Sequence, residues 1–444
     1  MALAEATNFF LDDVETDSSL STIATGVIGS EILKIAADVR QAVARGEKLL
    51  NLTVGDFSPE HFPIPRSLQA EIDRAYRQHQ TNYPPSDGVL ALREQVAAFV
   101  EREQGLRYPL ESIVIAGGAR PILYGTYRTV LDRGDTVVYS VPSWNNNHYS
   151  YLTEVVPVEI EGRPENGFFP TASEFEPHLA KARLIVLNSP MNPSGTVVDP
   201  EELRKICGMI LEENSRRKKL GRKTLFLLYD QIYSALHFKN SVRSSPPELA
   251  PEMFPYTILL DGISKQFAAT GLRVGWALGP PALIRRMRDI LGHVGAWAPK
   301  PEQVATARFL ADREGVESYR SEFLSRVEAR LELLYSLFSR LKAAGLPVEA
   351  IEPQGAIYLS ARFALAGQEI GGSRLRTNEE IRKLLLQRAG IAAVPFQAFG
   401  YRPENGWFRL SVGAVSEQDI VSAEPRLREC LGVATLAARS SSRD

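Results

Sequence analysis

Polar and charged residues follow directly after several short apolar runs of this sequence. Asp230 and Tyr233 come after the run 224–229, and Lys265 follows the run 257–260, with Arg273 eight residues later. Each has a structural explanation when taken alone, since most lysines are solvated surface groups and an aspartate can cap a helix. A buried carboxylate, however, needs a cation or hydrogen-bond donors. The combination of an acid, a phenol, a lysine and an arginine at strand ends therefore indicates a functional site.

Two further loops lie at the ends of predicted strands. The segment 117–121, Gly-Gly-Ala-Arg-Pro, follows the apolar run 113–116. A proline in the first turn of a helix suits a helix N-terminus that offers its N–H groups to an anion such as phosphate. A plain strand-to-helix turn is an equal alternative, because no Gly-x-Gly-x-x-Gly or Walker pattern is present. Asn192 lies in Asn-Pro-Ser-Gly, which by itself is an ordinary β-turn sequence.

The elements that must position these residues alternate between strand and helix. Helical periodicity at 203–211 and elsewhere separates the apolar runs, which predicts β-α-β units and a mainly parallel sheet covered by helices. The fold class is therefore α/β, and ligands of such sheets bind at the carboxyl ends of the strands. The predicted buried strands are 113–116, 136–140, 184–188, 224–229, 257–261 and 273–278.

A second lobe is expected beyond about residue 300. Apolar residues repeat at threes and fours from Phe323 to Leu341, which predicts one long amphipathic helix, and shorter strand-like runs follow it. With 444 residues, the chain exceeds the roughly 250–300 at which a single core stops growing. We expect a flexible arm at 1–20, a segment at 21–60 that packs with the small lobe, a large domain at 61–305, a small α+β domain at 306–434 and a disordered tail at 435–444.

Composition argues against several classes of protein. The formal net charge of −2 offers no field for nucleic acid or an anionic membrane, and no apolar run reaches the roughly 18 residues of a membrane span. Two cysteines and the lack of a signal-peptide pattern favour a cytoplasmic protein. The six histidines show no metal-ligand spacing, so no metal is expected, and a Gly-x-Ser-x-Gly hydrolase motif is absent.

One cofactor fits the residues at the strand ends. Pyridoxal phosphate needs a lysine for covalent attachment, an anion site, a carboxylate for its ring nitrogen and donors for its phenolic oxygen. From about Asn51 to Val412 the sequence resembles the class I/II aminotransferases of pyridoxal-phosphate fold type I, above all in Asp230-x-x-Tyr233 and Ser264-Lys265. The resemblance implies a large domain with a seven-stranded sheet, a smaller α+β domain, and ping-pong transfer of an amino group between an L-amino acid and a 2-oxo acid. The aspartate and aromatic types are the candidate substrate classes.

The resemblance also implies a role for each matching residue. Lys265 would bind the cofactor and move a proton, Asp230 would pair with the ring nitrogen, and Tyr233 would contact the phenolic oxygen. Trp144 would stack on the ring, and Tyr83 would reach the site of a partner subunit, which implies a homodimer. Asn192 would join Tyr233 at the phenolic oxygen, the phosphate would be held by Gly118, Ala119, Arg120, Ser264 and Arg273, and the substrate carboxylate by Arg409, with Gly55 and Asn192 beside it.

Two departures from the family pattern and two rival functions complete the interpretation. Gly262 stands where many members have serine, and Ile32 stands where the aspartate-specific branch has threonine. Gly262 argues against assuming the family's usual affinity for the cofactor, and Ile32 argues against assigning aspartate as the substrate. A pyridoxal-phosphate lyase, of the C–S lyase or aminocyclopropane-carboxylate synthase kind, would share every cofactor residue. A non-catalytic amino-acid sensor is the alternative outside enzymes.

Overall fold

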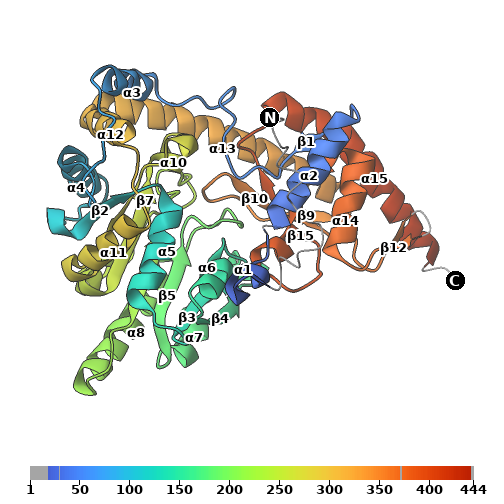
Figure 1. The fold of residues 1–444 in the computed structure, drawn as a ribbon. Coiled ribbons are helices and arrows are strands. Elements are labelled where there is room, and N and C mark those ends of the chain that lie inside the picture. The colour runs from blue at the N-terminus through green and yellow to red at the C-terminus, as the bar shows by residue number, and fades with distance from the viewer. Residues whose placement is uncertain (1–18, 30, 371–372, 442–444) are drawn as a thin grey trace, which may run out of the picture.

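The computed structural model describes residues 19–29, 31–370 and 373–441, which form two lobes (Figure 1). The large lobe is built around a seven-stranded sheet and the small lobe around a four-stranded sheet. Helix α13 (Arg313–Ala343) connects them, because it contacts α12 (Lys300–Ala311) in the large lobe and strands β9 and β10 in the small lobe. The long amphipathic helix expected from the sequence is therefore the bridge between the lobes.

The large sheet is mainly parallel, with strand order β2-β8-β7-β6-β5-β3-β4. Only β8 runs antiparallel to its neighbours. The strands are β2 (Ile113–Ala116), β3 (Thr136–Val141), β4 (Val156–Glu161), β5 (Ala182–Asn188), β6 (Phe226–Asp230), β7 (Thr257–Gly262) and β8 (Gly275–Leu278). The α/β prediction is confirmed. The sequence reading missed β4 because this edge strand is half exposed and includes Pro157.

Helices cover both faces of this sheet, which explains why its strands read as nearly continuous apolar runs. Leu228 and Leu260 pack on one face with α5 (Ala119–Val130) and α11 (Pro281–His293), whereas Leu227 and Leu259 pack on the other face. The other helices of this lobe are α3 (Arg66–Arg77), α4 (Leu90–Gln104), α6 (Asn146–Leu152), α7 (Ala172–Phe175), α8 (Pro200–Lys219), α9 (Pro246–Leu249) and α10 (Ile263–Gln266).

The small lobe includes residues 31–51 of the N-terminal segment, whereas residues 22–26 lie on the large lobe, where the Tyr151 hydroxyl of α6 donates a hydrogen bond of 2.9 Å to the Thr22 carbonyl oxygen. Strand β1 (Leu50–Asn51) pairs in parallel with β13 (Ile391–Ala392), and Asp38 of α2 (Glu31–Ala44) forms an ion pair of 2.6 Å with Arg382. Its antiparallel sheet has the order β14-β15-β10-β9. The remaining elements are β9 (Val348–Ala350), β10 (Tyr358–Phe363), β11 (Glu369–Ile370), β12 (Ser373–Arg374), α14 (Asn378–Leu384), β14 (Val394–Pro395), β15 (Trp407–Ser411) and α15 (Glu417–Ser441).

The chain ends differ from expectation where they are described. The arm predicted at 1–20 lies almost wholly outside the described residues, and α1 (Thr22–Gly26) follows it. Residues 435–441, which belong to the predicted disordered tail, continue the backbone of α15. None of the helices in the described part of the chain is long and apolar enough to cross a membrane.

Candidate active site

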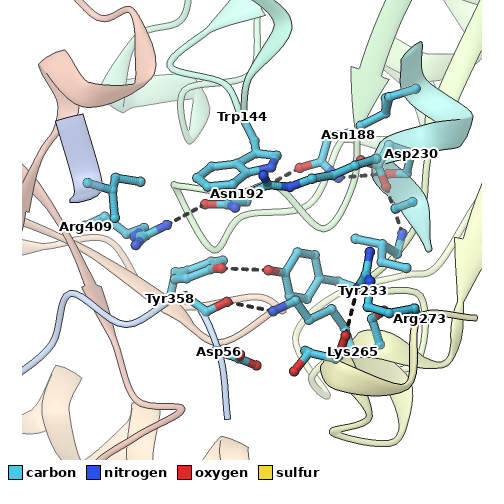
Figure 2. Close-up of a pocket in the computed structure, with 18 residues that line it drawn as sticks. Asp56, Trp144, Asn188, Asn192, Asp230, Tyr233, Lys265, Arg273, Tyr358 and Arg409 are labelled. Atoms are coloured by element: carbon cyan, nitrogen blue, oxygen red, sulfur yellow. Dashed lines mark hydrogen bonds between the residues drawn. The ribbon is translucent and has the colours of Figure 1, made fainter. Parts of the chain in front are cut away.

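A cavity of about 330 Å³ opens at the carboxyl ends of the parallel strands, between the two lobes (Figure 2). β6 ends at Asp230, α10 after β7 carries Lys265, and the small lobe contributes Arg409 from β15. Eleven residues predicted for the site line the cavity: Gly55, Ala119, Arg120, Trp144, Asn192, Asp230, Tyr233, Ser264, Lys265, Arg273 and Arg409. Residues from both lobes and from the N-terminal segment thus converge on one space.

The amine of Lys265 projects into this cavity. Its Nζ atom donates a hydrogen bond of 2.6 Å to the carbonyl oxygen of Gly55. Burial lowers the pKa of Lys265 to about 8, against the opposing effect of Asp56, and three arginines lower it further. Those arginines are Arg120, Arg273 and Arg409. A lysine with this pKa is partly neutral near physiological pH, which is the form that attacks a carbonyl carbon.

Asp230 is a buried carboxylate at one end of the cavity. Its Oδ1 atom accepts a hydrogen bond of 3.0 Å from the backbone N–H of Ile232, and it forms no ion pair with any described residue. Burial raises the pKa of Asp230 to about 7, the Ile232 bond opposes this shift, and the neighbouring Asp261 adds to it. An ionised carboxylate here lacks a cation, which a protonated ring nitrogen would supply.

Positive groups gather beside α5. Arg273 donates to the carbonyl oxygens of Thr270 at 2.7 Å and Gly117 at 2.8 Å, and Ala119 and Arg120 bring the first turn of the helix to the cavity. Gly118 does not line the cavity but has a φ of 90°, and a side chain there would overlap the Arg273 guanidinium. Two arginines and a helix N-terminus suit a phosphate group.

Close backbone packing explains why position 262 is a glycine. A Cβ atom on Gly262 would lie 2.8 Å from the Cα atom of Gly275 and 2.8 Å from the carbonyl oxygen of Val274. The close approach of β7 and β8 therefore excludes a serine at this position. Ser264 is the hydroxyl residue that lines the cavity here.

Arg409 occupies the opposite end of the cavity from Asp230 (Figure 2). Only 1% of the residue is exposed, and its Nη atoms donate to Asn192 Oδ1 at 3.1 Å and to the Thr53 carbonyl oxygen at 2.8 Å. Its Nε atom is buried without a hydrogen-bond partner, and no carboxylate of the described residues forms an ion pair with Arg409. A buried guanidinium without an anion is costly, so the site is suited to receive a carboxylate.

Tyrosine and tryptophan side chains form the walls. The hydroxyl groups of Tyr233 and Tyr358 lie 2.6 Å apart, and Trp144 lies across the cavity from them with the Arg120 guanidinium 5.4 Å from its ring centroid. Tyr83 does not reach this cavity. Its side chain is 82% exposed and contacts only the ring of Trp297 among aromatic groups of the described chain.

Several lining residues were missed from the sequence. Asn188 is the last residue of β5, and this place at a strand end could have been read from the sequence. Its side chain donates a hydrogen bond of 2.9 Å to the Asp230 carbonyl oxygen and accepts one of 2.8 Å from the Asn192 N–H. Asp56 follows Gly55 directly. No local sequence pattern indicated that Tyr358 belongs to the site. The others are Leu123, Ile232 and Thr270, and Ile32, at which the sequence departs from the family pattern, also lines the cavity. In the described parts of the chain, no group of three or more histidine, cysteine or acidic residues could hold a metal ion.

The fold and site together define a pyridoxal-phosphate enzyme. The chain belongs to the aminotransferases of class I and II, because that family matches residues 47–423. It is 30% identical over 383 residues to the aspartate aminotransferase of Geobacillus stearothermophilus, which covers 85% of this chain and 90% of the relative. The probable aspartate/prephenate aminotransferase of Thermus aquaticus is 32% identical over 397 residues, with coverage of 87% and 92%.

Solved structures agree with this assignment. The aspartate aminotransferase from Rhizobium meliloti superimposes with a TM-score of 0.83 at 26% identity, covering 93% of this chain and 99% of that one. The predictions of family, fold type I, pyridoxal phosphate as cofactor and aminotransferase activity are thereby confirmed. The substrates are accordingly an amino acid and a 2-oxo acid.

Proposed function

We propose that the cavity is the active site of this aminotransferase, with Lys265 as the residue that binds pyridoxal phosphate. The supporting observation is the pair of uncompensated buried charges, Asp230 at one end and Arg409 at the other, with the Lys265 amine between them. The cofactor ring nitrogen matches Asp230, and a substrate carboxylate matches Arg409. Cofactor and amino acid together would then compensate both of these buried charges.

The remaining residues hold the cofactor in this proposal. Ser264, Arg120 and Arg273 bind its phosphate together with backbone N–H groups of Gly118 and Ala119. Tyr233 and Asn192 donate to its phenolic oxygen, and Trp144 stacks on its ring. When bound, pyridoxal phosphate supplies an aldehyde that takes up the amino group and a ring that accepts the electron pair left at Cα.

The chain's own residues then move one proton. Arg409 grips the α-carboxylate through its planar guanidinium, and the Gly55 backbone lies beside it, so the Cα–H bond is held in one orientation. The Lys265 amine is the base that takes the Cα proton. Ionised Asp230 stabilises positive charge at the far end of the cavity throughout this transfer.

We infer a substrate of the aspartate or aromatic type, with glutamate and 2-oxoglutarate as one substrate pair. The names of the relatives support this class. The wall of the cavity, however, includes the apolar Ile32, whose side chain offers no donor to a second carboxylate. The panel of substrates must therefore contain acidic, aromatic and aliphatic amino acids.

We also propose a cytoplasmic homodimer in which Tyr83 reaches the partner's site. The support is the exposed position of Tyr83 outside its own cavity, and the two free, buried cysteines suit a reducing compartment. Sedimentation of the full chain should give twice the monomer mass. A fully active monomer would contradict the dimer.

The decisive experiment compares Lys265→Ala with the wild type in the presence of pyridoxal phosphate. The wild-type absorbance should change with some amino acids and be restored by 2-oxoglutarate, whereas Lys265→Ala should show no turnover at an unchanged melting temperature. Lys205→Ala is the control, since Lys205 pairs with Glu202 on the surface of α8. Normal turnover in Lys265→Ala would refute the assignment, and ammonia release in place of exchange would indicate a lyase.

A further inference from the structure

Tyr358 lies between the two ends of the cavity. It is fully buried at the start of β10, and its hydroxyl group is 2.6 Å from that of Tyr233. Its ring lies 4.7 Å from the Arg409 guanidinium carbon and meets the Tyr233 ring edge-on at 5.7 Å (Figure 2). We propose that Tyr358 is a positioning residue that orients the Tyr233 hydroxyl and supports the Arg409 guanidinium. This inference rests on the proposed function of the cavity.

The hydrogen bond between the hydroxyl groups of Tyr358 and Tyr233 can run in only one direction when the cofactor is bound. A phenol has a single O–H donor, and Tyr233 must use its donor for the phenolic oxygen of the cofactor. Tyr233 can then only accept from Tyr358, so the O–H of Tyr358 points to Tyr233. A phenol that accepts a hydrogen bond becomes a stronger donor itself. Tyr358 therefore strengthens the bond that Tyr233 makes.

The backbone around Tyr358 is fixed to the large lobe. The N–H of Gly355 donates 3.1 Å to the Gly195 carbonyl oxygen, and that of Ala356 donates 2.9 Å to the Leu236 carbonyl oxygen. The hydroxyl of Ser360 donates 2.8 Å to the carbonyl oxygen of Ser194. Tyr358 is thus anchored to the turn that follows Asn192 and to the loop after Tyr233, and it does not depend on Tyr233 alone for its place.

The aromatic ring of Tyr358 contacts Arg409 at the other end of the cavity. In the pairing of β10 with β15, Tyr358 is opposite Ser411 and Ser360 is opposite Arg409, so Tyr358 and Arg409 are diagonal neighbours on one face of the sheet. An aromatic face beneath a guanidinium attracts its charge and limits its tilt. The charged groups around Tyr358 are Arg409, Asp56 and Lys265, which line the same cavity.

Two substitutions separate the two roles. Tyr358→Phe removes the hydroxyl and keeps the ring, whereas Tyr358→Leu removes both. Tyr127→Phe is the matched control, because Tyr127 is also fully buried, donates to Asn146 Oδ1 at 3.2 Å and does not line the cavity. The first readout is the pH midpoint of the absorbance change of bound pyridoxal phosphate. The second is the Kd of succinate, a dicarboxylate without an amino or oxo group.

Tyr358→Phe should raise the pH midpoint by roughly half a unit, because a weaker bond to the phenolic oxygen leaves more negative charge to hold the nearby proton. Its succinate Kd should stay within about twofold of wild type. Tyr358→Leu should raise the midpoint similarly and weaken succinate binding about 5- to 30-fold. Tyr127→Phe should change neither quantity.

An unchanged midpoint in Tyr358→Phe overturns the proposal, and so does an equal shift in Tyr127→Phe, which would report a general loosening of the fold. Unchanged succinate affinity in a folded Tyr358→Leu protein also overturns it. If Tyr358→Leu does not fold, the Phe variant decides. Failure of the proposed function itself looks different, since wild-type protein would then bind no pyridoxal phosphate through Lys265.

Discussion

Substitution of Arg409 by lysine tests the carboxylate site directly. The guanidinium is fixed by Asn192 and the Thr53 carbonyl oxygen, so its free edge can meet a carboxylate with two parallel hydrogen bonds. A lysine keeps the positive charge but offers a point donor, and one of the two bonds is lost. A hydrogen bond between charged groups contributes about 1.5–3 kcal/mol, which corresponds to a loss of about 10- to 150-fold in affinity.

The assay for Arg409→Lys is the Kd of succinate and the kcat/KM of the first half-reaction, both followed by the absorbance of the bound cofactor. The Kd should rise and kcat/KM should fall by the same factor, because the carboxylate is held equally in the ground state and the transition state. Arg362→Lys on the neighbouring strand is the control, since Arg362 pairs with Glu349 away from the cavity. Wild-type affinity for succinate in Arg409→Lys would refute the assignment of Arg409.

Three further predictions concern the cofactor site. Gly118→Ala should raise the Kd of pyridoxal phosphate at least about tenfold in equilibrium titrations, because the new methyl group displaces Arg273. Gly134→Ala is the control and should leave this Kd unchanged, since Gly134 also has a positive φ but lies in open space. Asp230→Asn should lower kcat at least about 100-fold. It should also raise the melting temperature of the cofactor-free protein above pH 7, since the cost of ionising Asp230 in the folded state builds up between its ordinary pKa of 3.8 and its raised pKa of about 7. A lower melting temperature there would contradict this reasoning. The rate at which the cofactor-free protein captures pyridoxal phosphate should rise about tenfold per pH unit and level off near pH 8, because only neutral Lys265 attacks. Stopped-flow absorbance measures this rate, and a plateau only above pH 10 would contradict the lowered pKa of Lys265.

The correspondence between sequence and structure is closest where a local pattern decides the conformation. The run 113–116 predicted a strand that β2 matches residue for residue, because both faces of that strand are buried and its apolar run is continuous. The predicted strand 273–278 begins at Gly275 instead. Arg273 adopts a left-handed conformation with a φ of 57°, which no pattern of hydrophobicity encodes.

Four basic residues, 216–219, form the last turn of α8, and here local pattern does not decide the structure. Net charge and composition argue against nucleic acid, but they do not distinguish between the members of a charged run. In the structure Arg217 is buried, pairs with Glu213 at 2.6 Å and donates to the carbonyl oxygens of Leu179 and Ala182. Its role is therefore to satisfy backbone carbonyl groups at the start of β5, which depends on the packing of segments far apart in the chain.

The sequence by itself determined the type of sheet, the cofactor and the residues that follow its strands. Strand ends meet at one edge of a parallel sheet, so Lys265, Asp230 and Arg273 could be placed together from their order alone. The tertiary structure decided what joins the lobes. Tyr358 and Asp56 line the cavity because of how the small lobe and the N-terminal segment approach the sheet, whereas Tyr83 lies outside it, against Trp297 of the large lobe. Such contacts join residues more than a hundred positions apart, and no local pattern specifies them.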